Sequence, residues 1–98
     1  MKILVVCNAG MSSSILVKKI REYAQSIQNE SEVLAVSSAS VSDEIGKWDV
    51  CLVAPQIMYA TDEIKGKLKI PTAAVDMRVY AISDGKGAYE QAKKLMEG

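Results

Sequence analysis

The chain has 98 residues, of which 49% are hydrophobic and 24% are charged, with 12 basic and 12 acidic residues in balance. This composition predicts one soluble globular domain over residues 1–98, and it excludes both a disordered chain and a membrane-spanning one. It also argues against nucleic acid as a partner, because such binding needs a basic surface that neutralises several phosphates.

The chain contains two cysteines and no histidine, which limits its chemistry. Its first apolar run, residues 3–7, is too short for a bilayer span or a signal peptide, so we expect a cytoplasmic protein without direct membrane insertion. In that reducing compartment both cysteines are expected to be thiols, and without histidine they cannot form an ordinary zinc site. We therefore expect no metal and no cofactor, and a nucleophile that depends on backbone dipoles or on a partner protein.

The first half of the chain predicts two strands and an amphipathic helix. Residues 2–6 form a short branched apolar run, which is typical of a strand buried on both faces of a parallel sheet. After the loop at 7–12, apolar residues recur at helical spacing. These are Leu16, Ile20, Tyr23, Ala24 and Ile27. Residues 33–36 predict a second strand, and a short helix is expected at 42–46.

The second half repeats the alternation of strand and helix. Residues 50–54 predict a third buried strand, ended by Pro55, which suits the first turn of the next helix. The inner face of that helix is expected to hold Ile57, Ala60, Ile64 and Leu68. Residues 72–75 predict a fourth strand, and a terminal helix follows the Asp84-Gly85 turn. Its inner face is expected to hold Ala88, Ala92, Leu95 and Met96.

This alternation predicts an α/β fold, a four-stranded parallel sheet with helices on both faces in a three-layer Rossmann-like arrangement. We expect the strand order 2-1-3-4, which puts a topological switch point between the first and third strands. Ligands of such sheets bind outside the carboxyl ends of the strands at that point. Two loops should meet there, the one that starts at Cys7 and a secondary loop formed by Ala54, Pro55 and Gln56.

The loop after the first predicted strand has the composition of an anion site. Gly10 permits backbone angles that turn N–H groups inward, the serines offer hydroxyl donors, and the helix N-terminus favours both a phosphate and the thiolate of Cys7. We predict Cys7 as the nucleophile. The predicted phosphate cradle is Asn8, Ala9, Gly10, Met11, Ser12, Ser13 and Ser14. Composition alone leaves a plainer reading open, in which Cys7 is a buried hydrophobe and the serines cap a helix.

The segment ILVVCNAGMSSS, residues 3–14, resembles the phosphorylation loop of the IIB subunits of the sugar phosphotransferase system, lactose/cellobiose/diacetylchitobiose family. Residues 54–57, APQI, are similar to the Gly-Pro-Gln segment that follows the third strand in that family, and length and element order agree over the whole chain. The resemblance implies a relay, in which a phosphohistidine on a IIA protein donates to Cys7 and the phosphocysteine passes its phosphoryl group to a sugar held by a IIC membrane subunit. Two residues depart from the family pattern, Ala54 in place of Gly and Ser13 where threonine is common.

Two other functions stay open at this point. A low-molecular-weight protein tyrosine phosphatase has a similar loop, but its Cys-x5-Arg motif clamps the phosphoryl group with arginine. Residues 7–14 contain neither Arg nor Lys, so hydrolysis should be slow. A regulatory module that only senses an anion would not need the thiol.

The remaining candidate residues have plainer predicted roles. Cys51 should be a core residue, offset from Cys7 by more than a disulfide can bridge. Asp76 is expected to cap a helix or form a turn, Tyr80 to have a structural role, and Ile57 to be core. The candidates for a rim that a partner contacts are Met11, Met58 and Tyr59.

Overall fold

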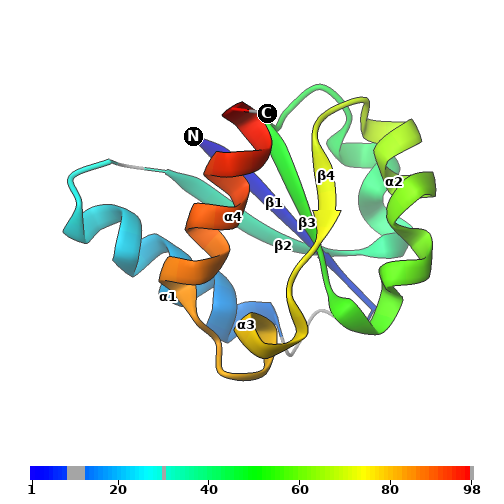
Figure 1. Cartoon of the computed structure of the whole chain (residues 1–98). Coiled ribbons are helices and arrows are strands. Elements are labelled where there is room, and N and C mark those ends of the chain that lie inside the picture. Colours follow the sequence, from blue (N-terminus) through cyan, green and yellow to red (C-terminus); the bar gives the residue numbers. More distant parts are fainter. Residues whose placement is uncertain (9–12, 30, 98) are drawn as a thin grey trace.

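The computed structural model describes residues 1–8, 13–29 and 31–97 (Figure 1). The described residues form a four-stranded parallel sheet in the order β2-β1-β3-β4, which confirms the predicted order 2-1-3-4. Its strands are β1 Lys2–Cys7, β2 Glu32–Ser37, β3 Val50–Val53 and β4 Thr72–Ala74.

The two inner strands are buried along most of their length, which explains their unbroken apolar sequences. Ile3 to Val6 and Val50 to Val53 are all 0% exposed. Such burial on both faces requires helices above and below the sheet. In register, Cys7 at the end of β1 lies beside Ser37 of β2, and Val6 lies beside Val53 of β3.

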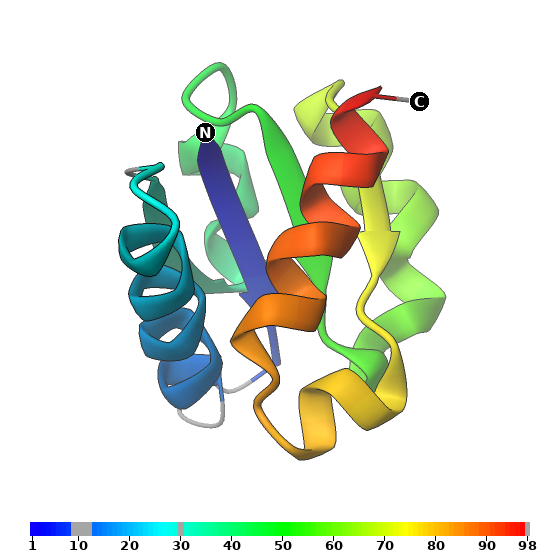
Figure 2. The ribbon, with the colours of Figure 1, turned by 60° about the vertical axis from the view of Figure 1, so that its left-hand side comes forward.

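Helices cover both faces of the sheet (Figure 2). On one face, α1 Ser13–Ser26 packs against α4 Gly85–Glu97, while α1 also contacts β1 and β2 and α4 contacts β3. On the other face lie the 3-10 helices η1 Ser38–Glu44 and η2 Pro55–Ala60, together with α2 Thr61–Leu68. The three-layer arrangement is the one expected from right-handed crossovers on either side of β1. No helix in the described part of the chain is both long enough and apolar enough for a bilayer span.

The structure differs from the sequence prediction in the segment after β2. The short helix expected at 42–46 is wrong in position, because η1 begins at Ser38 and ends at Glu44. Its start is set by Ser37, whose hydroxyl oxygen accepts a hydrogen bond from the Ala39 amide at 3.2 Å. A serine-rich stretch offers several such caps, so composition does not indicate which one begins the helix.

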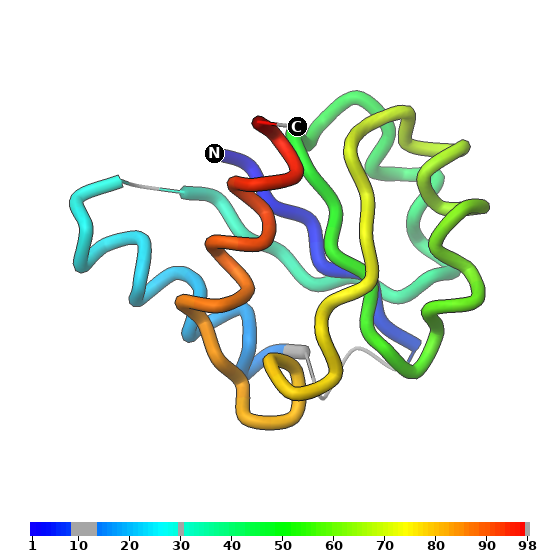
Figure 3. The backbone as a smooth tube through the Cα atoms, in the orientation of Figure 1, coloured from blue at the N-terminus to red at the C-terminus, as the bar shows by residue number. Residues whose placement is uncertain are grey.

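A short helix that the sequence did not predict, α3 Met77–Ala81, connects β4 to α4 at the carboxyl edge of the sheet (Figure 3). Two residues expected on inner helix faces are also exposed, Ile27 at 44% and Met96 at 45%. Ile27 lies beyond the end of α1, just before Gln28 turns the chain at φ 56°. Met96 is eight residues after Ala88, at the margin of the stripe that Ala92 and Leu95 continue.

Helices α1 and α4 approach each other closely because Gly85 has no side chain. A Cβ built at Gly85 would lie 2.3 Å from the carbonyl carbon and oxygen of Lys19. Further along the same interface, Tyr89 packs edge-on against Tyr23 with ring centroids 5.3 Å apart. The Tyr89 hydroxyl oxygen accepts a hydrogen bond of 2.5 Å from the side-chain Nδ2 of Asn29. These contacts hold the first half of α4 against α1 and against the turn that follows α1.

Candidate functional site

Cys7 is the last residue of β1, at the carboxyl edge of the sheet and next to the crossover where the chain reverses direction. Its side chain is buried, with 1% of the residue exposed, and its Sγ lies 3.7 Å from the carbonyl oxygen of Val36 in the neighbouring strand. The next residue, Asn8, is exposed. The thiol therefore lies just beneath the surface at the switch point of the sheet.

Most of the predicted phosphate cradle lies outside the described residues, namely Ala9, Gly10, Met11 and Ser12. Beyond this gap, α1 begins at Ser13, and Ser14 is exposed in its first turn. Leu16 and Val17 are buried and attach the start of the helix to the core. The N-terminus of α1, whose first N–H groups have no partner within the helix, thus follows Cys7 closely in the chain.

The secondary loop is joined to β1 directly beside Cys7. The Ala54 amide donates a hydrogen bond of 2.8 Å to the carbonyl oxygen of Val6, and the Ile57 amide donates one of 3.0 Å to the Ala54 carbonyl. Ala54 and Pro55 are buried and Gln56 is exposed. Because the Ala54 amide bonds to Val6, this residue positions the loop and does not offer its N–H to a ligand. Its φ of −60° and ψ of 141° are open to any residue, so alanine here is not strained.

The other candidate residues cap a helix, pack in the core or lie exposed on the surface. Asp76 caps α3, since its Oδ1 accepts hydrogen bonds from the amides of Arg78 at 2.9 Å and Val79 at 3.3 Å. This confirms its predicted role as a helix cap. Tyr80 is 9% exposed and belongs to the core, and Ile57 is 3% exposed, as predicted. Met58 and Tyr59 are 60% and 83% exposed, so both are available to a partner.

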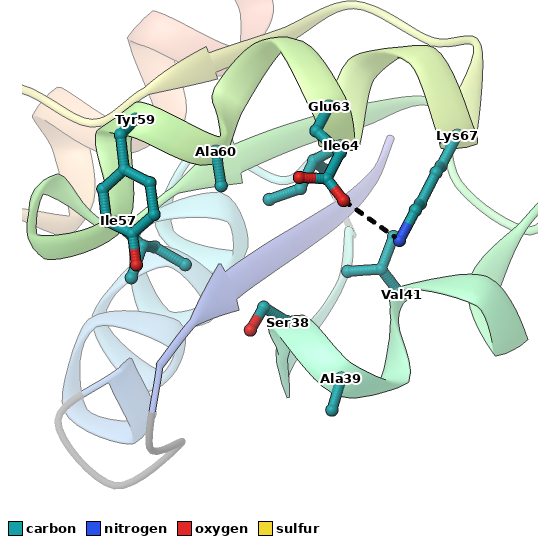
Figure 4. A pocket seen from close by; sticks show the side chains of 9 residues that line it. All are labelled: Ser38, Ala39, Val41, Ile57, Tyr59, Ala60, Glu63, Ile64 and Lys67. Carbon is teal, nitrogen blue, oxygen red and sulfur yellow. Dashed lines mark ion pairs between the residues drawn. The ribbon is translucent and has the colours of Figure 1, made fainter.

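A groove that the sequence did not predict lies between η1 and the segment formed by η2 and α2 (Figure 4). Val41, Ile57 and Ile64 form its apolar base, and the side chains of Glu63 and Lys67 pair across 3.5 Å at its rim. The other lining residues are Ser38, Ala39, Tyr59 and Ala60. The only sequence signal for this groove was Val41, an apolar residue between serines, because the two walls come from separate parts of the chain.

We predict that a thiol reagent modifies Cys7 before Cys51 at neutral pH. Cys51 is 0% exposed in the middle of the sheet, and burial raises the pKa of its thiol to about 12. Its thiol therefore stays protonated at neutral pH, and the thiolate is the reactive form. Cys7 is the last residue of β1 and is followed directly by the exposed Asn8. A small local opening at this end of the strand is therefore enough to expose its Sγ to the reagent.

Alkylation with iodoacetamide followed by peptide mapping measures this order of labelling. In denaturant both cysteines should react, which shows that each peptide can be detected. Rapid labelling of Cys51 in the folded protein would contradict the layout of the site.

Together these features define a class of protein, an α/β domain with a thiol at the switch point of a parallel sheet and a helix N-terminus closely following it. Residues 2–91 match the family model described as "PTS system, Lactose/Cellobiose specific IIB subunit". The chain therefore belongs to the lactose/cellobiose-specific IIB subunits of the sugar phosphotransferase system, as the sequence resemblance predicted.

Characterised relatives agree with this family. The chain is 42% identical to the oligo-beta-mannoside-specific EIIB component of Bacillus subtilis, over 97% of this chain and 95% of that protein. It is 30% identical to the cellobiose-specific EIIB component of Lactococcus lactis subsp. lactis, over 96% and 94%. The solution structure of a cellobiose-specific phosphotransferase IIB component protein from Borrelia burgdorferi superposes with a TM-score of 0.81 at 30% identity, covering 99% of this chain and 92% of that one.

Proposed function

We propose that this IIB subunit carries a phosphoryl group on Cys7, accepting it from a phosphohistidine of a IIA protein and delivering it to a sugar bound by a IIC membrane subunit. The observation that supports this most directly is the position of Cys7, at the carboxyl end of the central strand with the N-terminus of α1 following it. A helix N-terminus stabilises a dianion and favours a thiolate. The proposed cradle is the backbone and hydroxyl groups of residues 8–14.

The two steps are both phosphoryl transfers at sulfur. In the first, the thiolate of Cys7 attacks phosphorus, the S–P bond forms, and the P–N bond breaks with its electron pair on the imidazole, which takes up a proton. In the second, a sugar hydroxyl oxygen attacks the same phosphorus, the S–P bond breaks, and the thiolate is restored while the hydroxyl proton leaves to solvent or to a base on the permease. The chain has no histidine, so the imidazole comes from the donor protein.

Because Cys7 is 1% exposed, the atoms that cover its sulfur must move before an in-line donor can reach it. Docking of a partner at the carboxyl edge is the proposed trigger for that opening. Residues 7–14 contain no arginine or lysine to clamp a phosphoryl group for hydrolysis. The proposed place of action is the cytoplasm, at the inner face of the membrane.

The experiment that tests this proposal is intact-mass measurement after mixing the protein with a phosphoenolpyruvate-driven phosphoryl donor chain that ends in a IIA protein. We expect the gain of one phosphoryl group, mapped to Cys7 by peptide analysis. Addition of membranes with a cognate IIC subunit and a sugar should then remove it. Oligo-β-mannosides, cellobiose and galactose, the sugars named for the relatives, are the first to screen.

Two results would overturn the carrier function. Steady release of inorganic phosphate from an aryl phosphate by this chain alone would indicate a phosphatase. Binding of inorganic phosphate without any covalent product from the donor chain would indicate an anion sensor.

A further inference from the structure

Strands β2 and β4 are the outer strands of the sheet, so in the described part of the chain each has one side with no neighbouring strand (Figure 1). An unpaired strand edge presents a row of backbone N–H and C=O groups, and another chain can pair with such a row. The chain has no net charge, so no overall repulsion keeps two copies apart. The way each edge is covered therefore bears on self-association.

The backbone groups of β2 face β1 and the free side in alternation. The Glu32 amide donates a hydrogen bond of 3.0 Å to the Met1 carbonyl, so Glu32 faces β1. In a parallel pair every second residue does the same, so Leu34 and Val36 also bond to β1. The residues between them direct their N–H and C=O groups away from β1. These outward groups, which we call the free edge of β2, belong to Val33, Ala35 and Ser37.

Arg21 of α1 covers the first part of this free edge. Its Nη2 donates a hydrogen bond to the carbonyl oxygen of Val33. The Arg21 side chain is exposed, so it reaches the strand from the solvent side. The guanidinium occupies the place where the N–H of an added strand would lie, and a strand that paired there would have to displace a hydrated charge.

The side chains beside the free edge of β2 favour association once that edge is open. Leu34 is 40% exposed, and with the half-buried Trp48 it lines a recess of about 360 Å³ that extends to Arg21 and Val33. A second strand on this edge would bury part of that apolar surface. A second copy of the chain presents the same edge and the same recess, and two such edges pair antiparallel about a twofold axis.

The free edge of β4 is shorter and needs less cover. β4 has three residues, Thr72–Ala74, and the exposed Pro71 before it has no N–H to offer. The outward carbonyl of Ala74 accepts a hydrogen bond of 2.8 Å from the side-chain Nε2 of Gln91 in α4. β2 has six residues, so it is the edge on which a second strand would form the longer ladder.

We propose that Arg21 keeps the chain monomeric by closing the free edge of β2 to a second copy. When the guanidinium is removed, the β2 strands of two copies pair, and the Ala35 backbone becomes part of the new ladder. A plainer role for Arg21, attaching α1 to β2, predicts a less stable monomer and no dimer. The oligomeric state therefore separates the two roles, and the result does not depend on the carrier function.

The test is Arg21→Ala, measured by sedimentation equilibrium from about 0.01 to 1 mM protein. We expect the wild type to stay monomeric and the variant to form dimers in the upper part of that range. There the Ala35 amide should exchange its hydrogen at least about threefold more slowly in the variant than in the wild type, because it gains a partner. Lys18→Ala is the matched control, since it removes the same charge from an exposed position one turn earlier in α1, and it should stay monomeric.

Ala35→Pro, added to Arg21→Ala, shows whether the dimer uses this edge. The N–H that proline removes points away from β1, so the ladder between β1 and β2 is kept while the dimer should be lost. The inference is overturned by a monomeric Arg21→Ala chain at the highest concentration, by a wild type that already dimerises, or by dimers that persist with Ala35→Pro. Should the proline variant fail to fold, an unchanged Ala35 exchange rate in the Arg21→Ala dimer would place the contact elsewhere and overturn it equally.

Discussion

Replacing Cys7 by serine is expected to lower phosphoryl acceptance from a IIA donor by at least about a thousandfold, because a serine hydroxyl needs a neighbouring base to become a nucleophile. The chain has no histidine to serve as that base. A helix N-terminus cannot ionise an alkyl hydroxyl near neutral pH. Since Sγ and Oγ are close in size, the fold should be kept.

The measurement is the rate of phosphoryl incorporation, with thermal unfolding as the check on structure. Cys51→Ala is the matched control, because it removes the other thiol from the middle of β3. It should accept phosphate at close to the wild-type rate despite a loss of stability of about 1 kcal/mol from the small cavity. Normal acceptance by the Cys7 variant would mean that another residue is the acceptor.

Replacing Gly85 by alanine is expected to destabilise the protein by about 3 kcal/mol, the largest effect we predict for a single methyl group. The new Cβ would lie 2.3 Å from Lys19 carbon and oxygen and 2.8 Å from the Ile20 nitrogen. These are backbone atoms inside α1, so the helices must separate instead of a side chain moving aside. Separation loosens the packing of Tyr89 against Tyr23 further along the interface.

Urea unfolding of the variant measures this loss, and Gly66→Ala provides the comparison. A Cβ at Gly66, in the exposed part of α2, would meet no atom within 4 Å. That substitution should therefore leave stability unchanged or raise it by about 0.5–1 kcal/mol, as alanine is the better helix former. Equal midpoints for the two variants would show that α1 and α4 can shift apart without cost.

Much of the fold could be predicted because the spacing of apolar residues within a single segment indicates whether that segment is a helix or a strand. The unbroken runs in β1 and β3 indicate burial on both faces, and the structure buries them fully. The alternation with helices then leaves few topologies, since crossovers are right-handed. The position of Cys7 at the end of a central strand follows from the same pattern.

Local structure without a strong apolar stripe was predicted less well. The start of η1 depends on which of several serines accepts the capping hydrogen bond, and Ser37 does. Helix α3 has five residues, too few to show a period, and its cap Asp76 was the one visible signal. Met96 fell outside the buried stripe because it is the last apolar residue of α4, at the margin of the contact.

From its amino-acid order alone, this chain specifies four strands, of which β1 and β3 are buried, most of the helices between them and a thiol at the end of a central strand, because apolar residues repeat at the spacing of the element they form. The hydrogen bond from Ala54 to Val6, the close approach of Gly85 to Lys19 and the groove beside α2 arose only on folding. Each of these contacts joins residues from distant segments. The apolar pattern of one segment indicates which of its faces is buried, but it does not indicate which other segment packs against that face.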